Sequence, residues 1–133
     1  MKAVYATGTN YDDPLSVLEV GTMPEPETKP FWSTIRVNSA SVNHHDVWSL
    51  QGVGLSDEQT PMILGTDAAG VLEEDIPVRK GLKAGSEVVL YTFVGTDGAG
   101  VMPGERRSIL SERYAGTMAE YTQVPSATVF AKP

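Results

Sequence analysis

The chain contains no cysteine, and this absence excludes several kinds of chemistry at once. Without thiols it can form no disulfide, no zinc–thiolate or iron–sulfur centre, and no cysteine nucleophile. Histidine is almost as scarce, because only two occur in 133 residues. Any metal site would therefore depend on carboxylates and at most two imidazoles.

Positive charge and long apolar runs are also in short supply. Ten Lys and Arg stand against 17 Asp and Glu, and the net charge of −7 argues against binding to nucleic acid or to an anionic membrane surface. No window reaches the apolar length of a membrane span. The first ten residues, MKAVYATGTN, contain no apolar signal core, so a cytoplasmic location is expected.

What the chain does contain is a series of short alternating segments. A single helix is expected after Asn43, and Gly52 and Gly54 should end it. The prolines between Pro24 and Pro30 indicate an extended connector. The length suits one domain, and many short strands with one short helix predict a mostly β fold arranged as a barrel. Strands are predicted at Lys2–Thr7, Leu15–Val20, Ser33–Val42, Glu87–Phe93, 117–124 and 127–132.

Residues 42–48, VNHHDVW, hold both histidines and are the strongest candidate for chemistry. Asn43 is a typical N-cap residue, and Asp46 falls in the first turn. Adjacent helical residues point about 100° apart, so His44 and His45 cannot easily chelate one ion, and the HExxH spacing is absent. The residues alone leave three interpretations open: a capped helical turn, an acid–base or cofactor-contact site, and a metal site completed by distant carboxylates.

Two glycine-rich segments lack the usual phosphate-binding patterns. GTDAAG at 65–70 and GTDGAG at 95–100 fit neither GxGxxG nor GxxxxGK[ST]. The first indicates close backbone packing. The second opens a lobe at Gly95–Tyr114, which is long for a compact domain and is therefore expected to be functional or mobile. Composition and spacing do not reach a reaction.

Four segments in this order carry a family resemblance: VNHHD, PMILGTDAAGV, KAGSEV and GTMAEY. With them the chain resembles, over nearly its whole length, the amino-terminal catalytic domain of the medium-chain dehydrogenase/reductase superfamily. This group includes zinc alcohol dehydrogenases and zinc-free quinone oxidoreductases. The resemblance implies a GroES-like, partly open β-barrel with one or two short helices over residues 1–133. It also implies a following Rossmann domain, absent from this chain, that binds NADPH or NADH.

The departures from the family pattern indicate the subclass. In zinc members the resemblance places a cysteine ligand at Asn43, a histidine–glutamate pair at Thr66-Asp67, and four structural cysteines in the lobe. Here Asn43 and Thr66 are poor zinc ligands, and the lobe has no cysteine. Asn43 matches instead the asparagine of quinone-oxidoreductase-like members. The resemblance therefore implies a reductase without zinc.

The resemblance also places the start of the helix beside the nicotinamide ring. It implies two catalytic residues, Asn43 to position substrate or nicotinamide and His45 to supply a proton. Trp48 is expected either to wall the substrate pocket or to pack in the core. The remaining residues of the cleft would be His44, Thr66 and Asp67.

The function implied is the substrate-binding half of an NAD(P)H-dependent, zinc-independent oxidoreductase. It would act on a small molecule such as a quinone, an enone or a related carbonyl compound or alcohol, as a homodimer, and the isolated domain would be inactive. One alternative is a zinc alcohol dehydrogenase with atypical ligands, such as His44 with Asp46 or Asp67. Another is a free-standing GroES-like binding module. Without its partner domain the chain should expose apolar surface near Trp48, Met62 and Phe93 and should self-associate.

Overall fold

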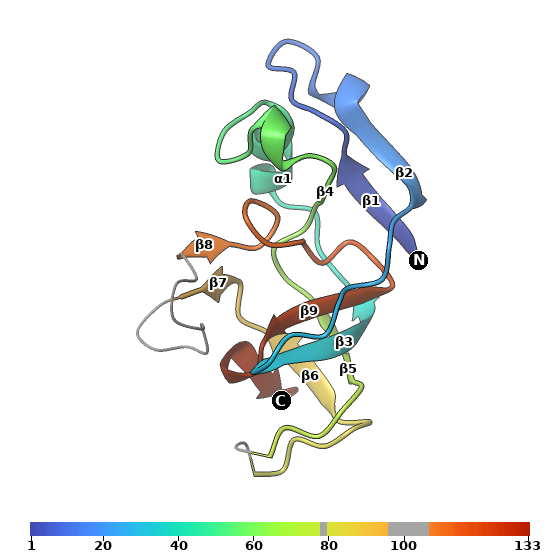
Figure 1. Ribbon diagram of the computed structural model, residues 1–133, viewed down its shortest axis with the longest axis vertical. Helices are drawn as coiled ribbons and strands as arrows, with labels where there is room; N and C mark the ends of the chain where they lie inside the picture. Colours follow the sequence, from blue (N-terminus) through green and yellow to red (C-terminus); the bar gives the residue numbers. More distant parts are fainter. Residues whose placement is uncertain (78–79, 96–106) are drawn as a thin grey trace.

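The fold is known from a computed structural model that describes residues 1–77, 80–95 and 107–133 (Figure 1). Within these ranges the chain forms ten strands, one α-helix and three short 3₁₀ helices, which confirms the prediction of a mostly β domain. The described strands form three separate antiparallel sheets and no closed barrel. This arrangement agrees with the partly open β domain expected from the motifs.

A three-stranded sheet occupies the upper half of Figure 1 together with the helix. Strand β1 (Lys2–Ala6) lies between β2 (Leu18–Thr22) and β4 (Met62–Ile63). The helix α1 (His44–Leu50) packs beside it through a small apolar core, and its described buried members are Ala6, Leu50, Leu55, Met62 and Leu64. Two 3₁₀ helices, η1 (Pro14–Val17) and η2 (Asp57–Gln59), lie in the loops of this half.

A five-stranded sheet forms the lower half, with the order β10-β6-β5-β3-β9. Its largest side chains, including Ile35, Leu72 and Val124, are fully buried in the main core. Beside it lies a two-stranded pair, β7 (Phe93–Val94) with β8 (Ser108–Ile109). The remaining elements are β3 (Trp32–Ser39), β5 (Ala69–Leu72), β6 (Glu87–Leu90), β9 (Tyr121–Pro125), η3 (Ser126–Thr128) and β10 (Val129–Ala131).

Two predicted strands begin or end at other residues than expected. The strand expected at Leu15–Val20 starts only at Leu18, since Pro14, which lacks a backbone N–H, opens the helix η1. The strand expected at Ser33–Val42 ends at Ser39. Beyond it, the Ser41 N–H donates to Asp67 Oδ1 at 2.9 Å instead of to a neighbouring strand. At this point the Asp67 side chain therefore replaces a neighbouring strand as the hydrogen-bond acceptor.

Two more predicted strands are divided between different partners. The run Glu87–Phe93 breaks after Leu90, because Phe93 pairs with Ile109 in the small sheet. Residues 117–120 form no strand, and β9 begins at Tyr121. Thr117 N–H instead donates to Gly65 O, and Met118 N–H donates to Leu64 O at 2.8 Å. The segment 116–118 thus fixes the loop that follows β4.

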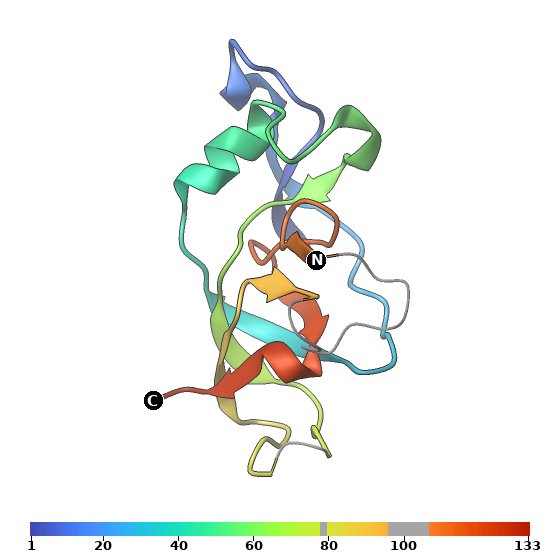
Figure 2. The same cartoon turned by 90° about the vertical axis from the view of Figure 1, so that its left-hand side faces the viewer.

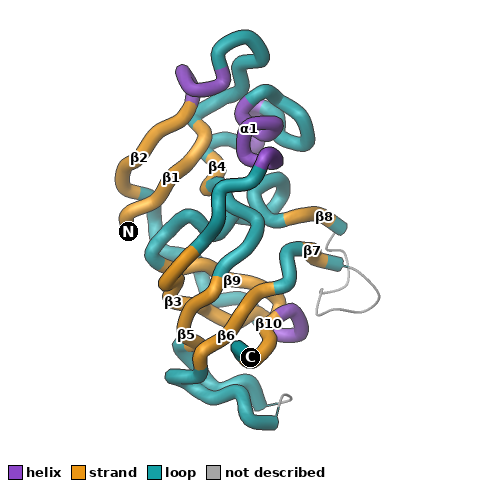
Figure 3. Tube along the Cα trace, turned by 180° about the vertical axis from the view of Figure 1, so that it is seen from behind, coloured by secondary structure: helices purple, strands orange, loops and turns teal. Residues whose placement is uncertain are grey.

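The chain crosses between the two larger sheets where the candidate site lies. The segment that follows β3 runs up from the five-stranded sheet to the start of α1 (Figure 3). In the view of Figure 2, α1 lies above the side of the five-stranded sheet on which β10 and the C-terminus lie. In the part of the chain that the structure describes, no helix is long and apolar enough to cross a membrane. Most of the predicted lobe, residues 96–106, lies outside the described residues.

Candidate functional site at the start of α1

The start of α1 is held in place by one buried carboxylate. Asn43 is the N-cap, and its backbone N–H donates to Asp46 Oδ2 at 2.8 Å. The other oxygen, Asp46 Oδ1, accepts the N–H of Gly65 at 3.0 Å. Asp46 is only 4% exposed, so its two bonds act in a low-dielectric setting. They bring the first turn of the helix against the turn that carries Thr66 and Asp67.

The side chain of Asn43 joins the oxygens of three other residues. Its Nδ2 donates to Asp67 Oδ2 at 3.0 Å, and Thr66 Oγ1 and Ser41 Oγ each lie 3.3 Å away. Asp67 Oδ2 also accepts the Ser41 hydroxyl at 2.6 Å. Ser41, Asn43, Thr66 and Asp67 thus form one connected group, which we call the Asn43 cluster. Three of the six site residues expected from the sequence meet here.

The pKa of Asp67 reports on this network. Burial opposes ionisation of the carboxyl and is the largest single influence on it. Hydrogen bonds from the Ser41 hydroxyl, the Ser41 backbone N–H and the Asn43 amide act in the opposite direction and together prevail, so the pKa of Asp67 is lowered below its ordinary value. Asp67 is therefore an anionic acceptor at neutral pH.

The Asn43 cluster does not have the donor set that zinc prefers. It contains no thiolate and no imidazole, and Asn43 directs its N–H₂ group toward the three oxygens. Both oxygens of Asp67 already accept hydrogen bonds. Over residues 1–77, 80–95 and 107–133, no group of three or more His, Cys, Asp and Glu side chains could hold a metal ion. The residues at this position do not fit a catalytic zinc.

His45 is paired with an acid from a distant part of the chain. Its Nε2 lies 2.9 Å from Glu112 Oε1, and both side chains are largely shielded from solvent. Its Nδ1 lies 3.5 Å from the Oγ of the buried Ser49, one turn along the helix. With Glu112 accepting from Nε2–H, Nδ1 is the nitrogen whose existing contact is the weaker one.

Contacts of Glu112 with Gln59 and Gly54 determine its position beside His45. Gln59 Nε2 donates to the backbone carbonyl of Glu112 at 2.9 Å and fixes the loop that follows β8. Gly54 has a φ of +78°, and a Cβ at that position would overlap the Glu112 carboxylate. The backbone conformation at this position therefore favours glycine, and a larger residue would also push the Glu112 carboxylate away from its place beside His45.

The two other predicted site residues lie on the outer face of α1. His44 and Trp48 are exposed, and their rings are in contact, with centroids 4.9 Å apart and planes inclined at 54°. Neither joins the Asn43 cluster. Trp48 is 48% exposed and is not a core residue in this chain. Its ring is available to whatever covers this face of the helix.

The expected apolar surface is confirmed at two of its three positions. Phe93 is 44% exposed, as Trp48 is, but Met62 is only 8% exposed, so the expectation was wrong for this residue. The reason is that Met62 belongs to β4, which pairs with β1 and packs among the apolar residues under α1. The pattern PMI reads as an apolar end of a loop, whereas Met62 and Ile63 form a short, buried edge strand that pairs with β1.

Sequence reasoning missed two residues of the site and understated a third. Ser41 stands two positions before the N-cap, and a small polar residue there is a weak but readable signal. Glu112 is 67 positions from His45, and nothing local to it marks its role. Asp46 was read as a favourable charge in the first turn, while the structure makes it the link between the helix and Gly65.

With this geometry in place, comparison with known proteins identifies the family. The model of the alcohol dehydrogenase GroES-like domain matches residues 29–133. The chain belongs to this family. The GroES-like domain is part of the medium-chain dehydrogenase/reductase superfamily, as the sequence motifs indicated.

Solved structures agree with the family and extend beyond the chain. An NAD-dependent alcohol dehydrogenase is 35% identical, with a TM-score of 0.80, over 100% of this chain and 40% of its own. A cobalt- and zinc-bound thermostable alcohol dehydrogenase from Pyrobaculum aerophilum is 27% identical, with a TM-score of 0.78, over 99% of this chain and 41% of its own. The human synaptic vesicle membrane protein VAT-1 homolog-like protein, at 22% identity and a TM-score of 0.71, shares the fold over 100% of this chain and 35% of its own. The GroES-like domain thus spans about 40% of the length of the first structures it matches. Comparison with curated protein sequences finds no match.

Proposed function

We propose that this GroES-like domain is the substrate-binding part of a nicotinamide-dependent oxidoreductase that works without zinc. The proposal of an oxidoreductase is supported by the family and by the similarity to an NAD-dependent alcohol dehydrogenase. A Rossmann domain elsewhere in the protein would bind NADH or NADPH, consistent with matched structures that are more than twice as long. The substrate would be a small carbonyl compound such as a quinone or an enone.

The observation that carries zinc independence is the position of the Asn43 amide. It donates toward Ser41, Thr66 and Asp67, and so the protein itself satisfies the oxygens that would otherwise be available to a metal. A cation at this point would have to displace the amide group and break the bonds from Ser41 to Asp67. The chemistry of the cluster supports hydrogen-bonding catalysis rather than Lewis-acid catalysis.

In the proposed reaction, Asn43, Thr66, His45 and Glu112 would each have a role. The nicotinamide, when bound, supplies a hydride to the substrate carbon. Asn43 and Thr66, both members of the Asn43 cluster, would orient the substrate oxygen, and the negative charge that develops on this oxygen needs a proton. We place that proton on His45. Glu112 would stabilise the protonated ring at Nε2, and Nδ1, held only by a 3.5 Å contact to Ser49, would deliver its proton to the substrate oxygen.

The test uses the full-length protein and two substrate classes. Oxidation of NADH or NADPH is measured with a quinone or enone and, separately, with an aldehyde, before and after extensive treatment with a chelator. We expect quinone or enone reduction that survives the chelator in protein whose elemental analysis shows no stoichiometric zinc. Activity that disappears with the chelator and returns with zinc would overturn the zinc-free assignment.

One alternative keeps zinc and is separated by the same experiment. It needs His44 with Asp46 or Asp67 as ligands, yet the His44 ring contacts the Trp48 ring, and both oxygens of Asp46 are engaged. The other alternative is a binding module without oxidoreductase activity. A full-length protein that oxidises neither nicotinamide with any of these substrates would favour it.

A further inference from the structure

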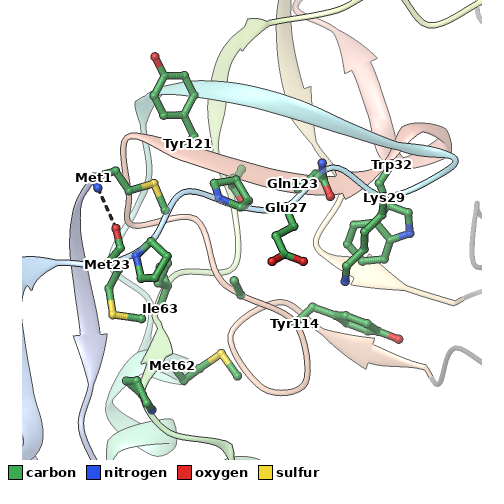
Figure 4. Close-up of a pocket in the computed structure, with 15 residues that line it drawn as sticks. Met1, Met23, Glu27, Lys29, Trp32, Met62, Ile63, Tyr114, Tyr121 and Gln123 are labelled. Carbon is green, nitrogen blue, oxygen red and sulfur yellow. Dashed lines mark hydrogen bonds between the residues drawn. The ribbon is translucent and has the colours of Figure 1, made fainter.

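A pocket lies away from the Asn43 cluster and shares no residue with it. It has a volume of about 320 Å³ and lies between the proline-rich connector after β2, the strand β4 and the segment from Tyr114 to β9 (Figure 4). This volume is at the low end for small-molecule sites. The pocket is therefore suited to a ligand of roughly ten non-hydrogen atoms.

The two ends of this pocket differ in character. Figure 4 shows Met1, Met23 and Ile63 gathered at one end, and Met62 lies near them. Glu27, Lys29 and Gln123 lie together at the other end, beside Trp32. Flexible methionine side chains adapt to apolar groups of varied shape. The pocket is thus amphipathic: one end is apolar apart from the Met1 ammonium group, which donates to Met23 O, and the other end contains both signs of charge.

Gln123 provides a buried acceptor that has no partner. The residue is 7% exposed, and its Oε1 makes no hydrogen bond within the described residues. Its Nε2 is directed at Thr34 Oγ1, 3.5 Å away, which turns the amide so that the oxygen faces the side of Glu27 and Lys29 (Figure 4). A buried acceptor without a donor is unusual in a folded protein and indicates a missing partner.

The two charges at the polar end are not neutralised by each other. No ion pair of Glu27 or Lys29 is present in the described part of the chain. The Lys29 ammonium instead lies 4.6 Å from the centre of the Trp32 ring, in a cation–π contact that leaves its hydrogen-bond donors free for an anion. An unpaired acid, an unpaired base and an unpaired buried acceptor therefore meet at one end of an apolar pocket.

We propose that this pocket binds a small zwitterion with an apolar side chain, of the class of the aliphatic amino acids. The ligand's ammonium group donates to the Glu27 carboxylate and, once the buried Gln123 amide turns toward the pocket, to Gln123 Oε1, and its carboxylate accepts from Lys29. Its side chain occupies the apolar end among Met23, Met62 and Ile63. A purely anionic ligand would meet Glu27, and a purely cationic one would meet Lys29, so the charge pattern selects a molecule that carries both charges.

The inference is independent of the proposed oxidoreductase function and is tested by binding alone. L-leucine is titrated into ¹⁵N-labelled protein, and the indole and glutamine side-chain signals are followed. The two tryptophans, Trp32 and Trp48, provide a matched pair, because Trp48 lies on α1, outside the pocket. We expect saturable shifts at Trp32 and Gln123 at millimolar ligand or below, with Trp48 unchanged.

Three analogues and two variants decide which groups matter. L-leucinamide lacks the carboxylate, 4-methylpentanoate lacks the ammonium, and glycine lacks the side chain, so each should bind at least about tenfold more weakly than leucine. Lys29→Gln and Glu27→Gln, both at exposed positions, should weaken leucine binding to a similar extent while leaving the thermal midpoint unchanged.

Other outcomes would overturn the proposal in distinguishable ways. Equal binding of leucine and 4-methylpentanoate would show that only the apolar end is used. Stronger binding of leucinamide would indicate a cation site. The absence of any shift at Trp32 up to the solubility limit of leucine would show that the pocket is not a ligand site.

Discussion

Asp67 shows how single residues of the Asn43 cluster depend on one another. Because its pKa is lower in the folded chain than the ordinary value of 3.8, its ionised form stabilises the fold at pH values above about 3.8. This contribution is lost as the pH falls through the lower, folded value. In Asp67→Asn the unfolding free energy should therefore vary less with pH over that acid range. Since the group is only partly shielded, the difference should stay below about 1 kcal/mol.

Urea unfolding at a series of acid pH values measures this difference. Asp12→Asn is the matched control, because Asp12 is exposed and lies outside the cluster. Its pH profile should parallel that of the wild type. If Asp67→Asn and the wild type lose stability along identical curves, the hydrogen bonds from Ser41 and Asn43 do not act on Asp67 in solution.

His45 and Glu112 give a second prediction at the scale of residues. In the full-length enzyme, His45→Ala should lower the turnover number by roughly 10²–10⁴ and flatten its dependence on pH, as removal of a general acid does. Glu112→Gln should keep the hydrogen bond to Nε2 and remove the charge, so its turnover should fall less but its pH profile should move. Steady-state kinetics across the pH range measure both effects.

His44→Ala is the control for this pair, because His44 neighbours His45 but contacts Trp48 on the exposed face. It should leave the shape of the pH profile unchanged. A His45→Ala enzyme with the wild-type profile would remove His45 from proton transfer and leave its contact with Glu112 as a purely structural link.

At the scale of elements, Asp46 links α1 to the turn after β4. Both of its oxygens accept backbone N–H groups, from Asn43 and from Gly65. In Asp46→Asn one of these donors would face an amide N–H₂ group and lose its partner in a buried position, at a cost of about 1–3 kcal/mol. Denaturant unfolding should show this loss with an unchanged m-value.

Glu58→Gln is the comparison for this change, since Glu58 is an exposed acid in the helix η2. It should alter the unfolding free energy by less than about 0.5 kcal/mol. A similarly small effect of Asp46→Asn would mean that the helix start is held by its apolar contacts under Leu50 rather than by the carboxylate.

The elements also show which parts of this fold can be predicted from sequence. Local patterns sufficed for β1 and for α1, where strand-forming residues in the one and an N-cap asparagine in the other act over a few residues. They failed where the tertiary structure decides, as at Ser41, whose N–H bonds to Asp67 instead of continuing β3. They also failed at Phe93, which pairs with Ile109 in the two-stranded sheet and does not continue β6 of the five-stranded sheet. Glu112 could not be predicted, because its role depends on a contact with a residue 67 positions away.

Across the whole molecule, the candidate site lies where chain segments pass between the two larger sheets. The Asn43 cluster joins the end of β3, the start of α1 and the turn after β4, so it depends on the packing of both halves. The amphipathic pocket lies elsewhere, between the connector and β9. A ligand in that pocket and a substrate at the start of α1 would therefore use separate surfaces of the same domain.

The exposed face of α1 gives the last prediction. Trp48 carries a large apolar ring that is nearly half exposed, with the exposed Val47 next to it in the sequence and the His44 ring in tilted contact with it. Exposed apolar side chains favour association when no partner covers them. We expect the 133-residue chain to self-associate as its concentration rises, and Trp48→Ser to weaken that association several-fold.

Val20→Ser is the matched control, because Val20 is 76% exposed on the edge strand β2, outside this face. Sedimentation velocity over a range of concentrations measures all three proteins. A wild type that stays monomeric would show that this surface is too small or too polar to associate, and equal weakening by both substitutions would place the contact elsewhere.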